Sequence, residues 1–287
     1  MTLEFWFMLP IAFAIATLAM ASGVGGATFF SPLFILALRL EPEVAIGTAL
    51  ITETFGFASG LYAYIRDKVI DFKLGGIMLM ATIPMAILGT YLGGVVDPNI
   101  LKLVLAVGLL AVAISFLHAP DEEEVKRTNL EAAQTLAQTN PEACIIARDG
   151  EQICYVVKRK FEGLISGGVG GLFVGLISTG LGELNDYFLL KRCKVPSRVS
   201  VATSVFVIAV TVLAASGGHV VRFAQAGSET LDQVLSLVIF TVPGVLVGGQ
   251  VGPKVAAKVP EHTMQVILSV LFILIAFLTF GEVILEG

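Results

Sequence analysis

Charged residues are scarce in this chain: Asp, Glu, Lys and Arg make up 14% of its 287 residues, whereas a soluble domain carries about 25%. So little charge cannot cover a globular surface, which excludes an ordinary soluble protein. With 56% hydrophobic residues the chain would bury apolar area wherever it could, which excludes disorder. Only 3 cysteines are present, which excludes a disulfide-rich secreted scaffold. The net charge of −5 gives no support for nucleic-acid binding.

The apolar residues are gathered into segments, a pattern typical of an all-α polytopic membrane protein with a mean hydropathy of +0.88. A first set of segments covers residues 5–21, 27–38, 44–64, 74–96 and 100–118. A second set covers residues 161–178, 184–190, 199–216, 234–251 and 264–280.

Two of these segments, residues 27–38 and 184–190, are too short to cross a membrane alone, because a crossing helix needs about 20 residues. Each is second in its set, and each follows a glycine-rich break, at residues 23–26 and 180–182. The pattern predicts two repeats, each consisting of a broken-helix hairpin and three transmembrane helices.

Lysine and arginine predict the orientation. If each short segment returns the chain to the side it came from, one side receives most of these cations and the other only Arg39, Lys102 and Arg222. The positive-inside rule then places both termini outside and the central loop in the cytoplasm, in a multi-pass protein of the cytoplasmic (inner) membrane. The expected parts are a first transmembrane repeat (1–118), a cytoplasmic loop (119–160) and a second transmembrane repeat (161–287).

The central loop has its own local pattern. Residues 130–137 predict a short helix, and residues 143–146 and 152–157 flank a turn signal at residues 148–151, which predicts a β-hairpin. Cys144 and Cys154 fall on the two arms. In the cytoplasm we expect both to stay reduced, as inert thiols rather than a redox sensor.

An internal repeat links the halves. Thr-Ile-Pro at residues 82–84, with Gly89 and Gly93, recurs as Thr-Val-Pro at residues 241–243 with the same glycine spacing; residues 45–48 (Ala-Ile-Gly-Thr) recur as residues 200–203 (Ser-Val-Ala-Thr). Because each half has an odd number of segments, the repeats must be inverted. Inverted repeats with interrupted helices indicate a secondary transporter whose site lies at the repeat interface. The alternative is chance similarity between glycine-rich apolar sequences.

The stretch at residues 23–32, followed by Ala-Ile-Gly-Thr at residues 45–48, resembles the TauE/SafE family of sulfite and organosulfonate exporters, which are anion permease-like membrane proteins. The resemblance covers essentially the whole chain outside the central loop. It departs at residues 180–186, where Glu183 replaces a third glycine. The resemblance implies export of a small sulfur-containing anion, such as sulfite, sulfoacetate or a related organosulfonate.

The candidate site lies between the two hairpin tips. Glycine allows a ligand to approach the backbone closely, and a short helix beginning near residue 27 would offer free amides and a positive dipole end to an anion. The substrate-binding candidates are Gly25, Gly26, Thr28, Thr48, Gly180, Gly182, Asn185, Thr203 and Ser204. The alternatives are that the glycines serve only helix packing and that the threonines cap helices. Packing is the favoured role for the glycine pairs at residues 56 and 60, 89 and 93, and 244 and 248.

Acidic residues within membrane segments are costly, so each is a candidate for coupling. Glu53, Glu183 and Asp186 are the candidates, and a proton is the candidate coupling ion. Alternatively, Glu53 is a hydrogen-bonded structural residue, and Glu183 and Asp186 cap the short helix.

The sequence therefore predicts a secondary active exporter that works by alternating access, with no enzymatic activity, cofactor or metal. Its expected partners are the anion, membrane lipid and a candidate second copy in a homodimer, with no nucleic acid. One rival is a sensor or scaffold that signals through the central loop. Another is an intramembrane enzyme, for which no nucleophile or metal set completes a site.

Overall fold

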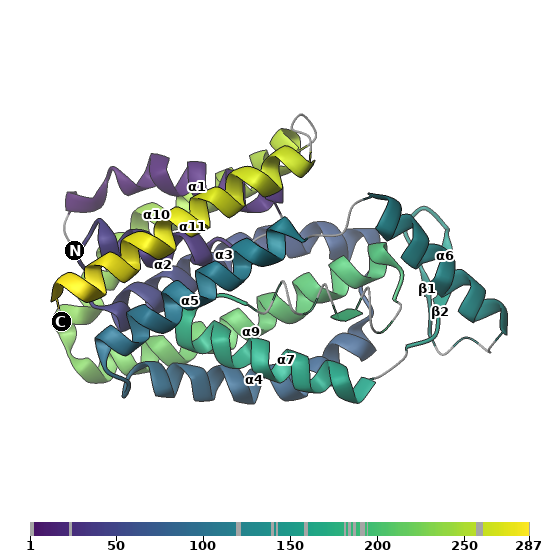
Figure 1. The fold of residues 1–287 in the computed structure, drawn as a ribbon, viewed down its shortest axis with the longest axis horizontal. Helices are drawn as coiled ribbons and strands as arrows, with labels where there is room; N and C mark the ends of the chain where they lie inside the picture. Colours follow the sequence, from purple (N-terminus) through teal and green to yellow (C-terminus); the bar gives the residue numbers. More distant parts are fainter. Residues whose placement is uncertain are drawn as a thin grey trace.

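Every predicted apolar segment outside residues 184–190 forms a helix in the computed structural model of the chain (Figure 1). The structure describes residues 3–22, 25–118, 122–138, 141, 143–157, 160–180, 182, 185, 188–189, 193, 195–256 and 261–286. After the 3-10 helix η1 (Leu3–Phe5), the first half contains α1 (Met8–Ser22), α2 (Ala27–Leu36), α3 (Pro42–Asp67), α4 (Phe72–Gly93) and α5 (Pro98–Leu117). The second half contains α7 (Lys160–Ile177), α9 (Ser197–Ala226), α10 (Ser228–Ala256) and α11 (Glu261–Glu286).

Six of the described helices are long and apolar enough to cross a membrane, and they lie within α3, α4, α5, α9, α10 and α11. The helices α1, α2 and α7 are apolar but shorter. Large apolar side chains such as Ile114, Phe277 and Leu246 are exposed on the outside of the bundle. A hydrocarbon environment suits such side chains, and the prediction of an all-α polytopic membrane protein is confirmed.

The helices of the two halves pack against each other through glycine. A methyl group added to Gly171 would lie 2.5 Å from the carbonyl oxygen of Thr82, so α7 lies almost backbone to backbone with α4. Gly244 brings α10 equally close to the carbonyl oxygen of Leu9 in α1, at 2.6 Å. Side chains larger than hydrogen cannot enter such contacts, which is the usual reason for small residues between membrane helices.

The predicted packing role is confirmed for most of the glycine pairs. Gly89 and Gly248 both lie against backbone carbonyls of the opposite half, and Gly60 lies against the Met20 side chain. The prediction is wrong for Gly56, because a methyl group there would face open space with no atom within 4 Å.

The helix pairings have a regular pattern. Helix α1 packs along α10 and α4 along α7; α4 also packs on α9, and α10 on α3. Helices α3 and α9 pack on each other, as do α5 and α11. Suppose that α1, α3, α4 and α5 correspond to α7, α9, α10 and α11, in that order. Replacing each helix by its counterpart then turns every one of these six pairings into another of the six or leaves it unchanged. Two repeats related by a two-fold axis would produce this pattern; the inversion itself stays a prediction.

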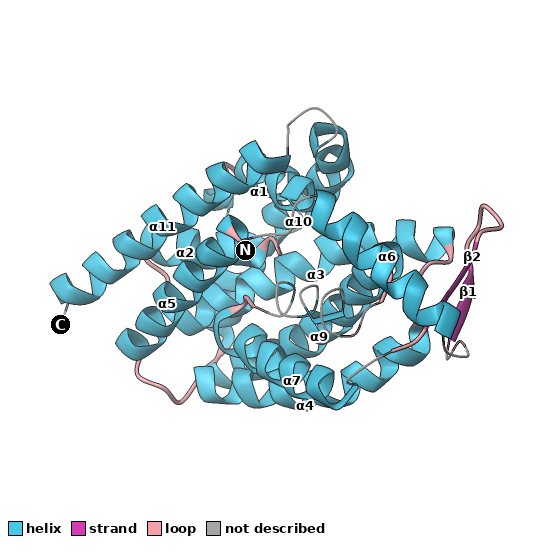
Figure 2. Ribbon diagram, turned by 45° about the vertical axis from the view of Figure 1, so that its right-hand side comes forward, coloured by secondary structure: helices cyan, strands magenta, loops and turns pink. Residues whose placement is uncertain are grey.

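The central loop contains α6 (Glu122–Gln138) and an antiparallel hairpin of β1 (Ala143–Ile146) and β2 (Gln152–Tyr155), the only strands in the described part of the chain (Figure 2). The hairpin appears where the turn signal predicted it. Helix α6 begins eight residues before the predicted start, at Glu122 rather than residue 130, because acidic residues favour the first turn of a helix.

The expectation of two reduced thiols is wrong in this structure, because Cys144 and Cys154 form a disulfide. The register of the hairpin makes them direct cross-strand partners, with Cα atoms 4.1 Å apart. This proximity follows from the pairing of the strands, which the turn signal indicated but did not fix to the residue.

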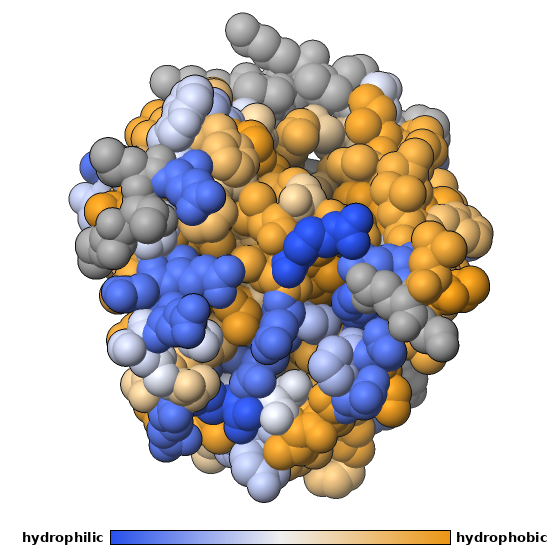
Figure 3. All heavy atoms as spheres, turned by 90° about the vertical axis from the view of Figure 1, so that its left-hand side faces the viewer, coloured by the Kyte–Doolittle hydropathy of each residue, from blue (hydrophilic) through white to orange (hydrophobic). Residues whose placement is uncertain are grey.

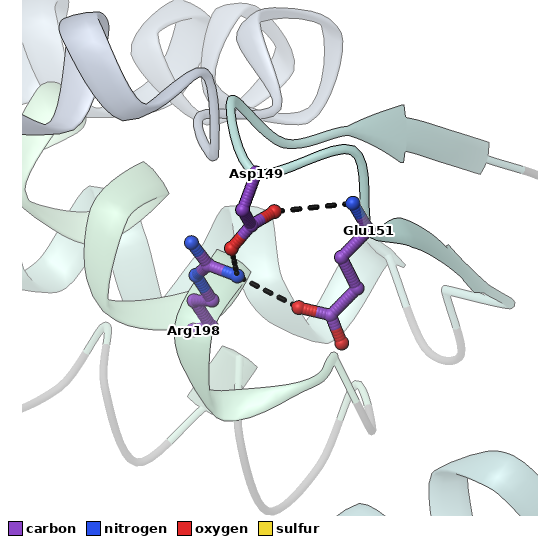
Figure 4. A network of polar contacts seen from close by, with 3 residues as sticks. All are labelled: Asp149, Glu151 and Arg198. Carbon is purple, nitrogen blue, oxygen red and sulfur yellow. Dashed lines mark hydrogen bonds and ion pairs between the residues drawn. The ribbon is translucent and has the colours of Figure 1, made fainter.

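The hairpin is attached to α9 by an ion-pair network (Figure 4). The guanidinium of Arg198, in the first turn of α9, lies 2.9 Å from the Asp149 carboxylate and 2.7 Å from that of Glu151. The Glu151 amide donates to Asp149, and this bond, followed by the charge of Arg198, lowers the pKa of Asp149 below its ordinary value. All three groups are well exposed, so we assign the network a positional role rather than a large stabilising one.

A buried contact fixes the same hairpin to the start of α4. The Tyr155 hydroxyl donates to the Asp71 carboxylate at 2.6 Å, and burial, together with this bond, raises the pKa of Tyr155. Asp71 also caps α4 by accepting from the amides of Lys73 and Leu74. The hairpin thus lies at one end of the bundle, and the two chain termini lie at the opposite end (Figure 1).

Candidate functional site

The first hairpin tip is built around a carboxylate. Residues Gly25 and Gly26 precede α2, and the amide of Ala27 donates to Glu53 Oε1 at 3.1 Å. Glu53 lies in α3 and is only 5% exposed. A methyl group at Gly25 would overlap that same oxygen, so the glycine provides the space that the carboxylate occupies.

The other amides at this tip have partners within the chain. Thr28 donates to the carbonyl of Gly25 at 3.2 Å, while Phe29 and Phe30 donate to the carbonyl of Gly26 at 3.0 and 3.1 Å. The first four amides of α2 are therefore engaged, one by a side-chain carboxylate and three by backbone turns.

The two tips contact each other directly. Thr28, in the first turn of α2, donates its hydroxyl to Thr179 Oγ1 at 3.0 Å. One turn further on, the hydroxyls of Ser31 and Ser178 are 2.5 Å apart. All four side chains are buried, and Ser178 and Thr179 follow the end of α7. The next residue, Gly180, has a φ of +101°, a backbone conformation that favours glycine.

Several buried polar groups of the second half have no hydrogen-bond partner in the described structure, and Asn185 and Ser204 are among them. Asn185 is fully buried, and neither its Oδ1 nor its Nδ2 makes a hydrogen bond within the described structure. Ser204 Oγ, in α9, is likewise buried and without a hydrogen bond to any described residue. An unsatisfied buried polar group costs about 1–3 kcal/mol, so each of these side chains marks a place where a ligand or water can complete the bonding.

Asn185 lies between α7 and α4. A methyl group at Gly167 of α7 would be 3.8 Å from Asn185 Oδ1 and 3.2 Å from the methyl of Thr82 in α4. Thr82 in turn is bonded to Thr211 of α9 at 2.8 Å. These contacts place Asn185 beside the helices of both halves.

The remaining predicted site residues are two threonines, one glycine and two acids. The Thr48 hydroxyl donates to the carbonyl of Val44 within α3, at 2.7 Å. The Thr203 hydroxyl accepts a hydrogen bond from the amide of Asp71 at 3.0 Å, so both hydroxyls already have partners within the chain. A methyl group at Gly182 would lie 3.5 Å from Ile208 in α9, which is an ordinary contact. Glu183 and Asp186 lie outside the described residues.

Sequence reasoning missed the hydroxyl pairs that join the halves. Ser31, Ser178 and Thr179 lie next to the glycine breaks, but nothing in the local sequence shows that they meet across the fold. The repeated threonines carry a better signal: Thr82 bonds to Thr211, and Thr241 bonds to Thr52, each in a long helix of the opposite half.

The space around the tips is uneven. A cavity of about 20 Å³ borders Gly26 and Glu53, room for about one water molecule. A cavity of about 540 Å³ lies between α5 and α7, has mainly apolar walls, and reaches Thr179 and Gly180. Among the described residues, no group of three or more His, Cys, Asp or Glu side chains could hold a metal ion.

The end of the bundle that carries the termini is polar at its centre (Figure 3). A cavity of about 290 Å³ at α3 and α9 is lined by Glu41, Glu43 and Arg222, among others. Arg222 forms an ion pair with Glu43, and Lys102 forms one with Glu282 at 3.0 Å. Arg222 and Lys102, which the sequence predicted for the outer side, therefore have anionic partners.

Comparison with known proteins gives a consistent result. A family model described as "Sulfite exporter TauE/SafE" matches residues 8–279. The "Probable membrane transporter protein YunE" of Bacillus subtilis (strain 168) is 24% identical over 280 residues, which cover 95% of this chain and 96% of that protein. The "Probable membrane transporter protein YjnA" of the same organism is 26% identical over 258 residues, covering 87% of this chain and 91% of that protein. No solved structure matches the chain significantly.

Proposed function

Because the chain belongs to the sulfite exporter TauE/SafE family, we propose that it is a secondary active transporter that exports a small sulfur-containing anion. Sulfite, sulfoacetate and related organosulfonates are the candidate substrates. The observation that carries the proposal is Asn185, which is buried beside Gly167 of α7 and has no hydrogen-bond partner in the described structure.

The donor groups of Asn185 and Ser204 are of the kind that binds an oxyanion. The amide nitrogen of Asn185 carries two donors and the Ser204 hydroxyl carries one, and neither has an acceptor in the described structure. Sulfite and sulfonate groups bring several acceptor oxygens. Uncharged donors favour binding that is weak enough to be reversed, which a carrier needs on both sides of the membrane.

The proposed cycle is alternating access, in which one hairpin-bearing half moves against the other. The hydroxyl pairs Thr28–Thr179 and Ser31–Ser178 join the tips and would have to part or slide during such a movement. We place the hairpin end in the cytoplasm and the termini outside, on the positive-inside rule. A proton is the proposed coupling ion, with Glu53, Glu183 and Asp186 as the sequence-derived candidates.

The test is uptake into inside-out vesicles. Radiolabelled sulfite, sulfoacetate and thiosulfate are offered separately, with and without an imposed proton gradient, to vesicles containing the protein, its Gly56→Ala variant or neither. We expect uptake of at least one anion in the first two and none in the third, since a methyl group at Gly56 would face open space. No uptake of any anion by correctly inserted protein would remove the proposed substrate class.

The attachment of the central loop to the helices favours a second candidate function, that of a sensor or scaffold. The hairpin touches α9 through Arg198 and α4 through Asp71, so a change in the helices would reach the loop. This candidate predicts that deletion of residues 122–157 abolishes function while anion binding is retained, whereas a transporter of the proposed kind should still move its substrate.

A further inference from the structure

A buried histidine, His219 of α9, has one ring nitrogen without a partner. The side chain is 1% exposed, and its Nε2 lies 3.2 Å from the carbonyl oxygen of Gly175 in α7. Its Nδ1 makes no hydrogen bond within the described structure. Because a carbonyl oxygen can only accept, Nε2 must carry the hydrogen of the neutral ring, which leaves a free lone pair on Nδ1. The ring therefore presents a buried basic nitrogen.

The His219 ring lies where the two halves meet. A methyl group at Gly47 of α3 would be 2.9 Å from His219 Cβ and Cγ, so the glycine makes room for the histidine. Its ring centroid is 5.9 Å from that of Phe223, one turn further along α9. His219 thus contacts α3 of the first half while it is bonded to α7 of the second, so a change in its charge would act on the contact between the halves.

Polar side chains continue along the same α3–α9 contact. Arg222, His219 and Ser216 recur every three residues in α9 and so lie on one side of the helix. Two of them have partners in α3, because Arg222 forms an ion pair with Glu43 and the Ser216 hydroxyl lies 2.9 Å from that of Thr54. The contact therefore carries a polar group on successive turns, from the outer ion pair towards the middle of α9.

The outer end connects this row to a polar cavity. The cavity of about 290 Å³ is lined by Glu43, Arg222 and Phe223, among others. Phe223 therefore borders both the cavity and the His219 ring. Rows of ionisable side chains that lead into a membrane protein are characteristic of proton relays.

The charged groups near the His219 ring are Glu43 of α3 and Arg222 of α9, which are paired with each other. Glu41 lines the cavity beyond them. Three further helices touch α9. The charged residues described in α4 and α7 lie at the starts of these helices, away from Gly175, and those of α10 lie at its outer start: Lys73, Lys160, Glu162, Glu229 and Asp232.

We propose that His219 binds the coupling proton, which enters from the outer cavity and is taken up on Nδ1. The proposal rests on the proposed function, because it assumes export coupled to protons. Proton uptake converts the neutral imidazole into an imidazolium, while Nε2 keeps its bond to the Gly175 carbonyl. The new positive charge attracts Glu43 and weakens its pairing with Arg222. Since that pair joins α3 to α9, proton binding favours opening of the outer end.

The test compares His219→Gln with the unmodified full-length protein in inside-out vesicles, whose lumen corresponds to the outside. Radiolabelled sulfite and sulfoacetate are offered separately, with a neutral or an acidic lumen, and vesicles without the protein give the background. Glutamine keeps a donor for the Gly175 carbonyl but binds no proton. His118→Gln is the matched control, because His118 is exposed at the end of α5.

We expect an acidic lumen to accelerate anion uptake by the unmodified protein and by His118→Gln. In His219→Gln this acceleration should be lost, while uptake with a neutral lumen remains. Acceleration that persists in His219→Gln would overturn the proposal. Loss of uptake at both lumen pH values in the folded variant would overturn it too, because it would indicate a structural role.

Two outcomes separate this proposal from the proposed function. If the unmodified protein takes up neither anion, both fail. If it takes up an anion at the same rate with a neutral and an acidic lumen, export stands and the proton site alone is contradicted.

A second measurement does not depend on the folding of His219→Gln. The chain has three histidines, so replacing His118 and His262 by glutamine leaves His219 as the single one. Nitrogen NMR of its isotope-labelled ring at neutral pH should show the hydrogen on Nε2 and a bare Nδ1. A neutral ring with the hydrogen on Nδ1 would contradict the proposed proton acceptor.

Discussion

At the scale of single residues, glycine has two separate roles in this chain. In the long helices it allows backbones to touch, as Gly171 does against Thr82. At the first tip it makes room for one side chain, because a methyl group at Gly25 would overlap Glu53. Neighbouring Gly26 has no such constraint, since the nearest atom to an added methyl group is 3.6 Å away, in the Phe30 ring.

This contrast gives a matched pair of variants. We expect Gly25→Ala to displace Glu53 from the Ala27 amide and to reduce anion uptake about tenfold or more, because a tip displaced by even 1 Å can cost about two orders of magnitude in rate. Gly26→Ala should retain uptake. Vesicle uptake normalised to membrane protein level measures both, and equal uptake in the two variants would contradict the role given to Gly25.

Cys193 provides a second prediction at this scale. Burial, with a smaller contribution from the Glu162 charge, raises the pKa of its thiol to about 12. Because the thiolate is the reactive form, we expect no maleimide labelling of the folded protein at mildly alkaline pH. The same shift favours the folded state below the ordinary thiol pKa, and that contribution is lost as the pH rises towards 12.

Mass spectrometry measures the labelling. Unfolding without reductant should expose a single reactive thiol per chain, since Cys144 and Cys154 are bonded to each other. Rapid labelling of native Cys193 would contradict the burial argument, and three labelled thiols after unfolding would contradict the disulfide.

At the scale of elements, hydropathy and turn chemistry predicted most of the fold. The apolar segments other than residues 184–190 form helices because a membrane span must satisfy its backbone bonds internally, and that requirement can be read from local sequence. The family resemblance carried by residues 23–32 and 45–48 is confirmed by the match over residues 8–279. The contacts of Thr28 with Thr179 and of Glu53 with Ala27 could not be predicted, because partners far apart in sequence leave no local pattern.

The close pairing of α4 with α7 makes a prediction about stability. Gly175→Ala places a methyl group against the carbonyl of Ala86 and 2.8 Å from the Thr90 amide, so the helices must separate. We expect a loss of about 1–3 kcal/mol of stability, the usual cost of overpacking. Gly76→Ala in α4 should cost nothing, since a methyl group there meets no atom within 4 Å. Thermal unfolding in detergent compares the two variants, and equal midpoints would show that the α4–α7 contact tolerates a side chain.

At the scale of the whole molecule, two observations agree with two related halves. The helix pairings are preserved when the helices of one half are replaced by those of the other, and both termini lie at the end opposite the hairpin. Orientation in the membrane rests on the cations, because the hairpin end carries Arg66, Lys68, Arg148 and Arg198, whereas Lys102 and Arg222 at the other end are paired with carboxylates. Sequence could supply this charge count but not the ion pairs that Lys102 and Arg222 form with carboxylates.

Reporter fusions test the orientation. An enzyme that is active only outside the cytoplasm should be active when attached after the last residue or inserted after Gly227, and inactive when inserted after Gln138. Activity after Gln138, with inactivity after Gly227, would reverse the orientation while leaving the fold unchanged.

The most direct test of the account is anion exchange by the purified protein. Proteoliposomes preloaded with unlabelled sulfite are offered radiolabelled sulfite, using the unmodified chain, Asn185→Ala and the packing-neutral Gly56→Ala. We predict rapid exchange with the unmodified chain and with Gly56→Ala, and exchange reduced about tenfold or more with Asn185→Ala, because its amide supplies donors that the anion would otherwise lose. Equal exchange in all three proteins would contradict a site at Asn185, and no exchange in any of them would contradict sulfite transport itself.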